Sequence, residues 1–266
     1  AITLFFISSC STLAFWSDDA EEETAEPAKL TKIQNQYTIE VEWKRSFSGE
    51  NDLGSFVPSF YSDEMIVADP DGNLVSINPS TGRINWEIDL KRNLSAGTAS
   101  GFGKIIVSDT NGFVIAIDSV TKETLWEKSV GGEILTNAVI SPSLIIVKNS
   151  AGELVALDSL TGEQKWSFRS QLPALTVRGT SEPIIENNVV YSTFDNGRIG
   201  AFELDTGYFL WDGPISFLEG TSELENLIDS DSSPVIAQQL IFATNYQGRL
   251  TAFDLAQKRP VWNAEA

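Results

Sequence analysis

A glycine and a tryptophan fourteen positions apart recur five times along this chain of 266 residues. The spacing within each pair is constant, whereas the distance from one pair to the next varies. Constant internal spacing with variable junctions is typical of a repeated supersecondary unit, and such a repeat determines the fold. The five pairs are Gly72 and Trp86, Gly112 and Trp126, Gly152 and Trp166, Gly197 and Trp211, and Gly248 and Trp262.

The residues between each glycine and its tryptophan follow one pattern. A small residue lies ten positions before the tryptophan, a large apolar residue nine before it, and in four units a threonine five before it. Turn pairs such as Asn111-Gly112 supply the positive φ that tight hairpins need. Apolar runs such as residues 144–147 precede the turn glycines. Each unit therefore predicts an antiparallel sheet of about four short strands.

Sheets of this size, buried on both faces and repeated at about forty residues, stack radially into a β-propeller. We therefore expect an all-β fold over residues 37–266, with an N-terminal strand and five blades of four antiparallel strands. The five repeated tryptophans are expected to be structural blade residues and not ligand contacts. The small residue ten positions before each is expected to form a blade-to-blade packing pair with it. These tryptophans are Trp86, Trp126, Trp166, Trp211 and Trp262.

The charge and the rare residues exclude several classes of function. The formal net charge is −19, which argues against binding nucleic acid through phosphates. The chain has no histidine, so histidine catalysis and histidine metal sites are excluded. A single cysteine rules out an internal disulfide and a CxxC metal knuckle. We expect no enzyme activity, no cofactor and no metal site.

The N-terminal residues resemble the end of a bacterial lipoprotein signal. Residues 1–9 are mainly apolar and read as a signal remnant. Residues 7–10, Ile-Ser-Ser-Cys, resemble a lipobox, which makes Cys10 the expected site of lipid attachment; the alternative is an ordinary cysteine in a cleaved signal or a short anchor helix. Residues 10–36 include an acidic run and are expected to be a disordered, lipid-anchored spacer. Ser11 follows the cysteine, which by resemblance to enteric sorting favours the outer membrane.

Two junctions between units are longer than the others. The distance from a tryptophan to the next glycine is 26 residues twice, then 31 after Trp166 and 37 after Trp211. Insertions in repeat proteins gather on one face, which is often the binding face. We define the first long loop as residues 170–179 and the second long loop as residues 219–231, and expect both on one rim of neighbouring blades.

The two long loops contain the candidate partner-binding residues. Apolar anchors beside an arginine are typical of interface hot spots. The alternative is that the apolar side chains pack under the loop and that the arginine pairs with one of the acids. The candidates are Leu175, Val177, Arg178, Asp229 and Asp231.

The repeat, with a consensus near Gly-x-Leu-x-Ala-Leu-Asp-x-x-Thr-Gly-x-x-x-Trp, resembles the pyrroloquinoline-quinone-type propeller repeat more than a WD40 repeat. The sequences at residues 175–183, 195–198, 229–234 and 245–252 resemble the BamB family, the propeller lipoproteins of the outer-membrane β-barrel assembly machinery. The lipobox, the spacer and a first tryptophan strand around Trp43 occur in the same order. The likeness extends from the lipobox to the C-terminus.

The resemblance implies a non-catalytic scaffold that binds the periplasmic POTRA domains of BamA and assists β-barrel assembly. It places the five candidate residues of the long loops at positions that contact BamA. It also implies an eight-bladed ring in which the strand of Trp43 completes the last blade, so this chain is expected to be part of a longer protein.

Two other functions stay open at this point. One is a quinone-dependent dehydrogenase, which shares the blade sequence but needs a calcium ion and an acidic base. The other is a propeller that binds peptides or glycans, for example by adding a strand to an exposed edge.

Overall fold

The computed structural model describes residues 32, 34, 36–50, 54–173, 175–176, 179–216, 227–230, 232–246 and 248–265. The chain divides into two compact units, residues 1–41 and 42–266. In the first unit, residues 36–41 form no helix or strand. The predicted signal remnant and Cys10 lie outside the described residues.

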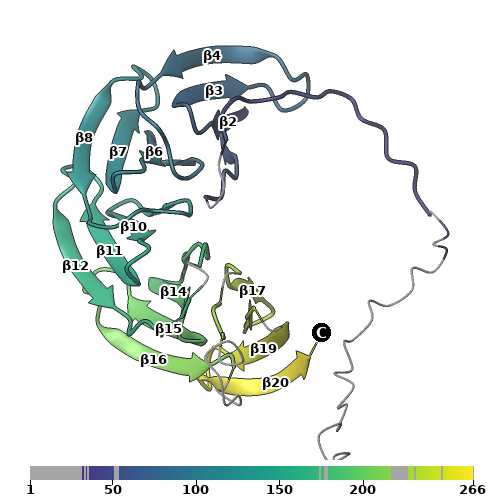
Figure 1. Cartoon of the computed structure of the whole chain (residues 1–266), viewed down its shortest axis with the longest axis vertical. Coiled ribbons are helices and arrows are strands. Elements are labelled where there is room, and N and C mark those ends of the chain that lie inside the picture. Colours follow the sequence, from purple (N-terminus) through teal and green to yellow (C-terminus); the bar gives the residue numbers. More distant parts are fainter. Residues whose placement is uncertain are drawn as a thin grey trace, which may run out of the picture. The chain divides into compact units, whose positions relative to one another are not determined.

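The second unit consists of five antiparallel sheets of four strands, and in each sheet the strands are ordered as they follow in the chain. We number the sheets as blades 1 to 5. Figure 1 shows them side by side along an arc, with the fourth strand of each on the outside. Blade 1 holds β1 (Ser59–Tyr61), β2 (Glu64–Ala68), β3 (Asn73–Ile77) and β4 (Ile84–Asp89). Blade 2 holds β5 (Ala99–Gly101), β6 (Lys104–Ser108), β7 (Phe113–Asp118) and β8 (Thr124–Ser129). Blade 3 holds β9 (Val139–Ile140), β10 (Leu144–Lys148), β11 (Glu153–Asp158) and β12 (Gln164–Arg169). Blade 4 holds β13 (Ile184–Glu186), β14 (Val189–Phe194), β15 (Arg198–Glu203) and β16 (Phe209–Pro214). Blade 5 holds β17 (Val235–Ala237), β18 (Leu240–Thr244), β19 (Arg249–Asp254) and β20 (Arg259–Glu265).

The hydrophobic core lies between successive blades. The second and third strands of each blade are apolar on both faces, and β6 and β10 are buried along their whole length. One buried cluster joins blades 2 and 3 through side chains such as Ile145 and Val114, and another joins blades 3 and 4 around Phe202. Each fully buried aliphatic or aromatic side chain contributes about 1.5–3 kcal/mol. The prediction of an all-β propeller built from four-stranded blades is confirmed.

The repeated tryptophans connect one blade to a turn of the next. The indole nitrogen of Trp166 in blade 3 donates to the carbonyl of Leu204 in blade 4 at 2.8 Å. Its ring covers Gly207, where a Cβ would lie 2.5 Å from the indole. Trp126 docks in the same way on Gly162, and its nitrogen donates to the carbonyl of Ser159 at 3.2 Å. These glycines have φ of +69° and +72°, so both the backbone and the close approach require glycine.

Trp43 repeats this docking on blade 1. Its indole nitrogen donates to the carbonyl of Pro79 at 2.8 Å, and its ring covers Gly82. Residues 38–50 are not a strand, however, because no described strand pairs with them. Trp43 therefore occupies the position of an outer-strand tryptophan although the strand expected around it is absent from the described structure.

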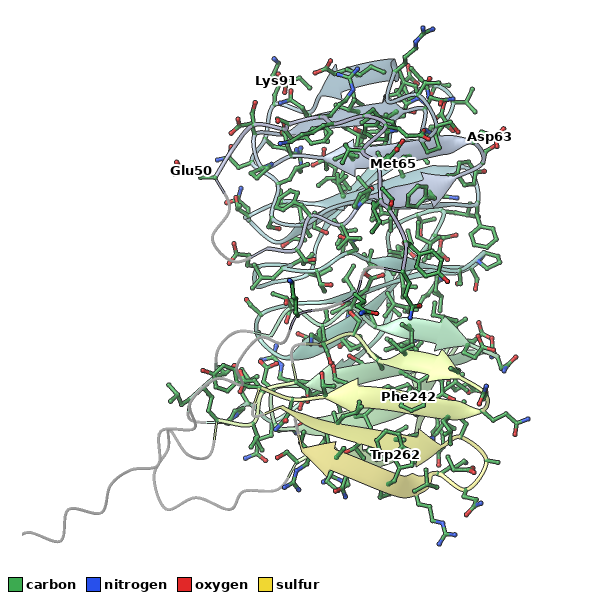
Figure 2. The ribbon with its side chains drawn as sticks, turned by 90° about the vertical axis from the view of Figure 1, so that its right-hand side faces the viewer. Glu50, Asp63, Met65, Lys91, Phe242 and Trp262 are labelled. Atoms are coloured by element: carbon green, nitrogen blue, oxygen red, sulfur yellow. The ribbon has the colours of Figure 1, made fainter. Side chains whose placement is uncertain are left out.

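The remaining tryptophans differ in their surroundings. Trp211 is 8% exposed, whereas Trp262 exposes 43% of its surface. Trp86 is partly buried; Lys122 stands at the position of the turn glycine, and its ammonium lies 4.0 Å from the centre of the Trp86 ring. In Figure 2, Phe242 and Trp262 lie on blade 5, where their ring centres are 5.9 Å apart.

The small residue facing each tryptophan lies within the same blade, which differs from the expected blade-to-blade pair. Ala156 is directly opposite Trp166 in the β11–β12 ladder, and Ala201 is opposite Trp211 in the β15–β16 ladder. A bulge follows each alanine. A small side chain at this position leaves room for the indole to extend along its own sheet toward the next blade.

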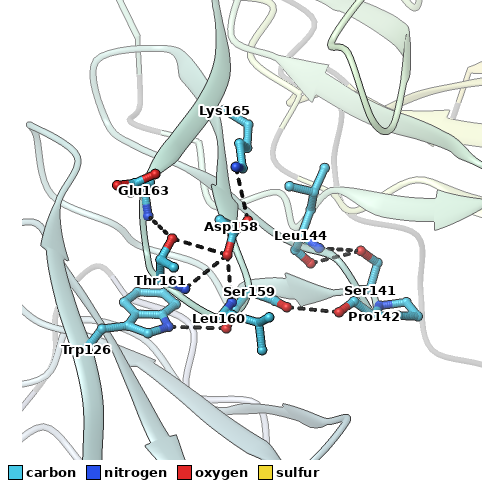
Figure 3. A network of polar contacts seen from close by, with 10 residues as sticks. All are labelled: Trp126, Ser141, Pro142, Leu144, Asp158, Ser159, Leu160, Thr161, Glu163 and Lys165. Atoms are coloured by element: carbon cyan, nitrogen blue, oxygen red, sulfur yellow. Dashed lines mark hydrogen bonds and ion pairs between the residues drawn. The ribbon is translucent and has the colours of Figure 1, made fainter.

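In blade 3, the aspartate eight positions before the tryptophan shapes the turn on which Trp126 of blade 2 docks. Asp158 accepts from the backbone N–H groups of Leu160 and Thr161, each at 3.0 Å, and pairs with Lys165 at 3.1 Å (Figure 3). Hydrogen bonds from Lys165 and then from the Thr161 backbone lower the pKa of the Asp158 carboxyl to about 2. The carboxylate therefore holds the turn that carries Ser159, whose carbonyl accepts from Trp126.

Candidate functional site

The two long connections leave the outer strands on the same rim. Ser170, after β12, donates its N–H to the carbonyl of Gly152 at 2.9 Å, and Ile215, after β16, donates to the carbonyl of Gly197 at 2.8 Å. Gly152 and Gly197 belong to the turns between the second and third strands of blades 3 and 4. The β12–β13 and β16–β17 connections are therefore equivalent and lie on neighbouring blades, in agreement with the sequence prediction.

A side-chain contact joins the two connections. The Thr176 hydroxyl of the first long loop donates to Oδ2 of Asp229 in the second long loop and lies 3.2 Å from Oδ2 of Asp195. Asp229 is fully buried and Asp195 is 7% exposed. Hydrogen bonds to buried carboxylates are stronger than those between neutral groups. Thr176 therefore connects both loops to the β14–β15 turn of blade 4.

The base of the second connection is fixed to blades 4 and 5. The carbonyl of Asp229 accepts from the N–H of Tyr246, in the β18–β19 turn, at 2.7 Å. Ile228, which is 5% exposed, packs on Gly197, where a Cβ would lie 2.8 Å from its Cδ1. Asp229 is thus held from its backbone as well as from its side chain.

A buried polar layer lies below these contacts. The Lys148 ammonium donates to the Ser181 hydroxyl and, at 3.1 Å, to the carbonyl of Thr193. The Thr193 hydroxyl lies 3.3 Å and 3.2 Å from the carbonyls of Ser230 and Ser232. Each hydrogen-bonding group named here has a partner, as most buried polar groups in native proteins do. The layer joins β10, both long connections and β14.

Blade 4 has an altered turn that makes the contact with Thr176 available. In the other blades an Asp or Asn occupies the first turn position, and its Oδ1 accepts the N–H four residues later at 2.8–3.1 Å. Blade 4 has Phe194 at this position, and Asp195 follows it. Aligning the turns, and not only the tryptophans, would have revealed this substitution from the sequence. The capping residues of the other blades are Asp69, Asp109, Asn149 and Asn245.

The structure places two of the five predicted partner-binding residues. Leu175 exposes 41% of its surface, so it is available to a partner, whereas Asp229 has no exposed surface. Val177, Arg178 and Asp231 lie outside the described residues. The alternative expectation, that Arg178 pairs with an acid, therefore stays a prediction. Thr176 and Asp195 are site residues that the sequence reasoning missed.

Within the described residues, no three His, Cys, Asp or Glu side chains gather as a metal site would require. The described elements are all strands, and that part of the chain contains no helix of the length and apolarity that crossing a membrane takes.

The five blades and the two long loops together define a β-propeller in which one rim carries longer connections than the other blades have. A family model described as "Outer membrane protein assembly factor BamB" matches residues 70–266. The chain belongs to this family, as its loop motifs indicated.

Individual relatives carry the same name. The BamB protein of Kangiella koreensis is 43% identical over 249 residues, which are 93% of this chain and 64% of the relative. That of Pseudomonas aeruginosa is 45% identical over 242 residues, which are 90% of this chain and 64% of the relative. The chain therefore spans slightly less than two thirds of the length of these relatives.

The solved structures agree with this assignment. BamB from Moraxella catarrhalis superposes with a TM-score of 0.73 at 25% identity, covering 79% of this chain and 63% of that protein. A europium-containing methanol dehydrogenase superposes with a TM-score of 0.65 at 14% identity, covering 80% of this chain and 51% of the enzyme. The second likeness shows the propeller fold alone.

Proposed function

We propose that this chain is a non-catalytic scaffold of the outer-membrane β-barrel assembly complex, and that its two long loops dock on the periplasmic POTRA domains of BamA. The names of its relatives support a role in assembly of outer membrane proteins. The observation that carries the proposal is the joining of both loops through Thr176 and Asp229 on one rim.

The buried position of Asp229 gives the five candidate residues two different roles. Leu175 is exposed and suits an apolar anchor that enters a pocket on the partner. We propose that Val177, Arg178 and Asp231 join it in direct contact with BamA. Asp229 acts as a positioning residue, because its carboxylate holds Thr176, the neighbour of Leu175, against blade 4.

The proposal also includes the location of the chain in the cell. Lipid attachment at Cys10, followed by an acidic spacer, would hold the propeller at the periplasmic side of the outer membrane. Stable anchoring requires more than one acyl chain, which the lipoproteins of this class carry. The net charge of the whole chain is −19, so anionic lipids would repel it.

A dehydrogenase function has less support. The likeness to quinone-dependent enzymes rests on 14–15% identity and shows the fold, whereas relatives at 43–45% identity are named assembly factors. Capture of a client strand at a blade edge is compatible with the scaffold role and concerns a different surface.

Reversing the charge of Arg178 tests the docking face. Arg178→Glu is expected to weaken binding to the POTRA domains at least tenfold in a pull-down, because an arginine hot spot contributes about 2 kcal/mol or more. Arg83→Glu is the matched control: Arg83 is exposed and follows the β3–β4 turn on the other rim. Unchanged capture by the Arg178 variant would remove the assignment of this face.

A further inference from the structure

A cleft of about 310 Å³ opens where the innermost strands of blades 1, 2 and 3 meet. It lies apart from the two long loops, although Glu182, just before β13, contributes to its wall. Val139 and Ile140 of β9 provide an apolar side, and hydroxyl, amide and carboxyl groups provide the rest. The cleft therefore suits a ligand with an apolar stem and a polar end.

Two hydroxyl groups of the cleft, those of Thr98 and Ser59, have already donated their protons. The Thr98 hydroxyl donates to the carbonyl of Ile66 at 2.8 Å, so its single proton is used. The contact of 2.7 Å between Ser59 Oγ and Thr98 Oγ1 is then donated by Ser59. Ser59 Oγ can therefore make further hydrogen bonds only as an acceptor, through its lone pairs.

Two further oxygens of the lining have no hydrogen-bond partner in the described structure. They are Ser100 Oγ and Asn137 Oδ1. Asn137 is 5% exposed, and one N–H of its amide nitrogen donates to the carbonyl of Val57 at 3.1 Å. Buried polar atoms in native proteins nearly always have partners. Asn137 Oδ1 can only accept, so it indicates a donor that enters the cleft, whereas Ser100 Oγ can either donate or accept.

Glu182 adds a carboxyl group to the same wall. Its backbone N–H donates to Ser233 Oγ at 2.8 Å, which fixes the residue between the two long connections. Burial raises the pKa of the Glu182 carboxyl to about 7. Of the lining residues that the structure describes, Glu182 alone ionises. A cation that entered the cleft would meet one carboxylate that it could neutralise.

We propose that this cleft binds an aliphatic ammonium group, such as a lysine side chain of a polypeptide or a free diamine. An ammonium has three donors and no acceptor, which matches the acceptor oxygens of Ser59, Ser100, Asn137 and Glu182 in the lining. Its methylene stem would lie along Val139 and Ile140, and its charge would face Glu182. The contact requires no reaction and is independent of docking through the long loops.

Binding of small amines to the purified protein tests the proposal. Nα-acetyl-lysine methylamide and 1,5-diaminopentane are titrated separately and followed by NMR of the Asn137 side-chain amide. At least one is expected to bind, with an affinity that rises from pH 6 to pH 8 as Glu182 loses its proton. Glu182→Gln should weaken that binding at least tenfold, whereas Glu186→Gln, on the neighbouring strand β13, should leave it unchanged.

Nα-acetyl-norleucine methylamide, which keeps the stem and lacks the charge, is the ligand control. Binding of the lysine probe alone would identify a polypeptide side chain, and binding of the diamine alone a free amine. The proposal is overturned if neither amine binds, if norleucine binds equally well, or if Glu182→Gln binds like the wild type. A ¹³C titration of Glu182 supplies a second readout, because a bound ammonium should lower the pKa of its carboxyl.

Discussion

Replacing Trp166 by alanine is expected to destabilise the propeller by about 3–5 kcal/mol, the usual range for truncating a buried tryptophan. Trp166 is 9% exposed, covers Gly207 of the next blade and stacks on Phe202 at 6.5 Å between ring centres. The substitution removes all of these contacts together with the hydrogen bond to Leu204. Urea unfolding followed by circular dichroism measures the loss.

Trp86→Ala is the matched control for this prediction. Trp86 occupies the same repeat position but is only partly buried, donates to Glu64 at 3.2 Å and faces Lys122, whereas Trp166 faces a glycine. We expect about half the loss or less, since less apolar surface is exposed by the change. Equal destabilisation by both substitutions would contradict the claim that tryptophan-on-glycine docking joins the blades.

Thr176→Val is expected to weaken binding to the POTRA domains at least tenfold. Valine keeps the shape of threonine but removes the hydroxyl that donates to the buried Asp229, and losing a donor to a buried group costs about 1–3 kcal/mol. The first long loop would then lose the side-chain contact next to Leu175, and Leu175 would no longer be presented in a fixed position. Biolayer interferometry with immobilised POTRA domains gives the dissociation constants.

Asp229→Asn and the double variant complete this test. If Asp229 acts by holding Thr176, the two single changes should not add, because both act on the same hydrogen bond, in which asparagine replaces the charged acceptor by a neutral one. Thr180→Val, four residues further along the same connection, should bind like the wild type. Additive effects of Thr176→Val and Asp229→Asn would show that the two residues act separately.

The fourteen-residue repeat predicted the blades, the number of strands in each and the rim that carries the long loops. These features follow from local residue patterns, since turn glycines and apolar runs act within a few residues of themselves. The internal spacing could not show that Trp166 docks on Gly207, because that contact links one unit to the next. The same limit explains why the small residue opposite each tryptophan was expected to pack between blades, although it lies within one blade.

The site was predicted less completely than the fold. The two loops were placed by their length, but the contact between Thr176 and Asp229 joins residues 53 positions apart. No local pattern encodes such a contact. The burial of Asp229 also depends on Ile228 packing on Gly197, and so on the arrangement of two blades. The sequence marks the site only at Phe194, because this residue stands in the blade 4 turn where the other blades have a capping Asp or Asn.

Photo-crosslinking from one exposed leucine on each rim tests the central claim most directly. A benzoylphenylalanine is placed at Leu175, in the first long loop, or at Leu160, which is 75% exposed in the β11–β12 turn on the other rim. The account predicts a crosslink to the POTRA domains of BamA from position 175 and none from position 160. A crosslink from position 160 with none from position 175 would contradict docking through the two long loops.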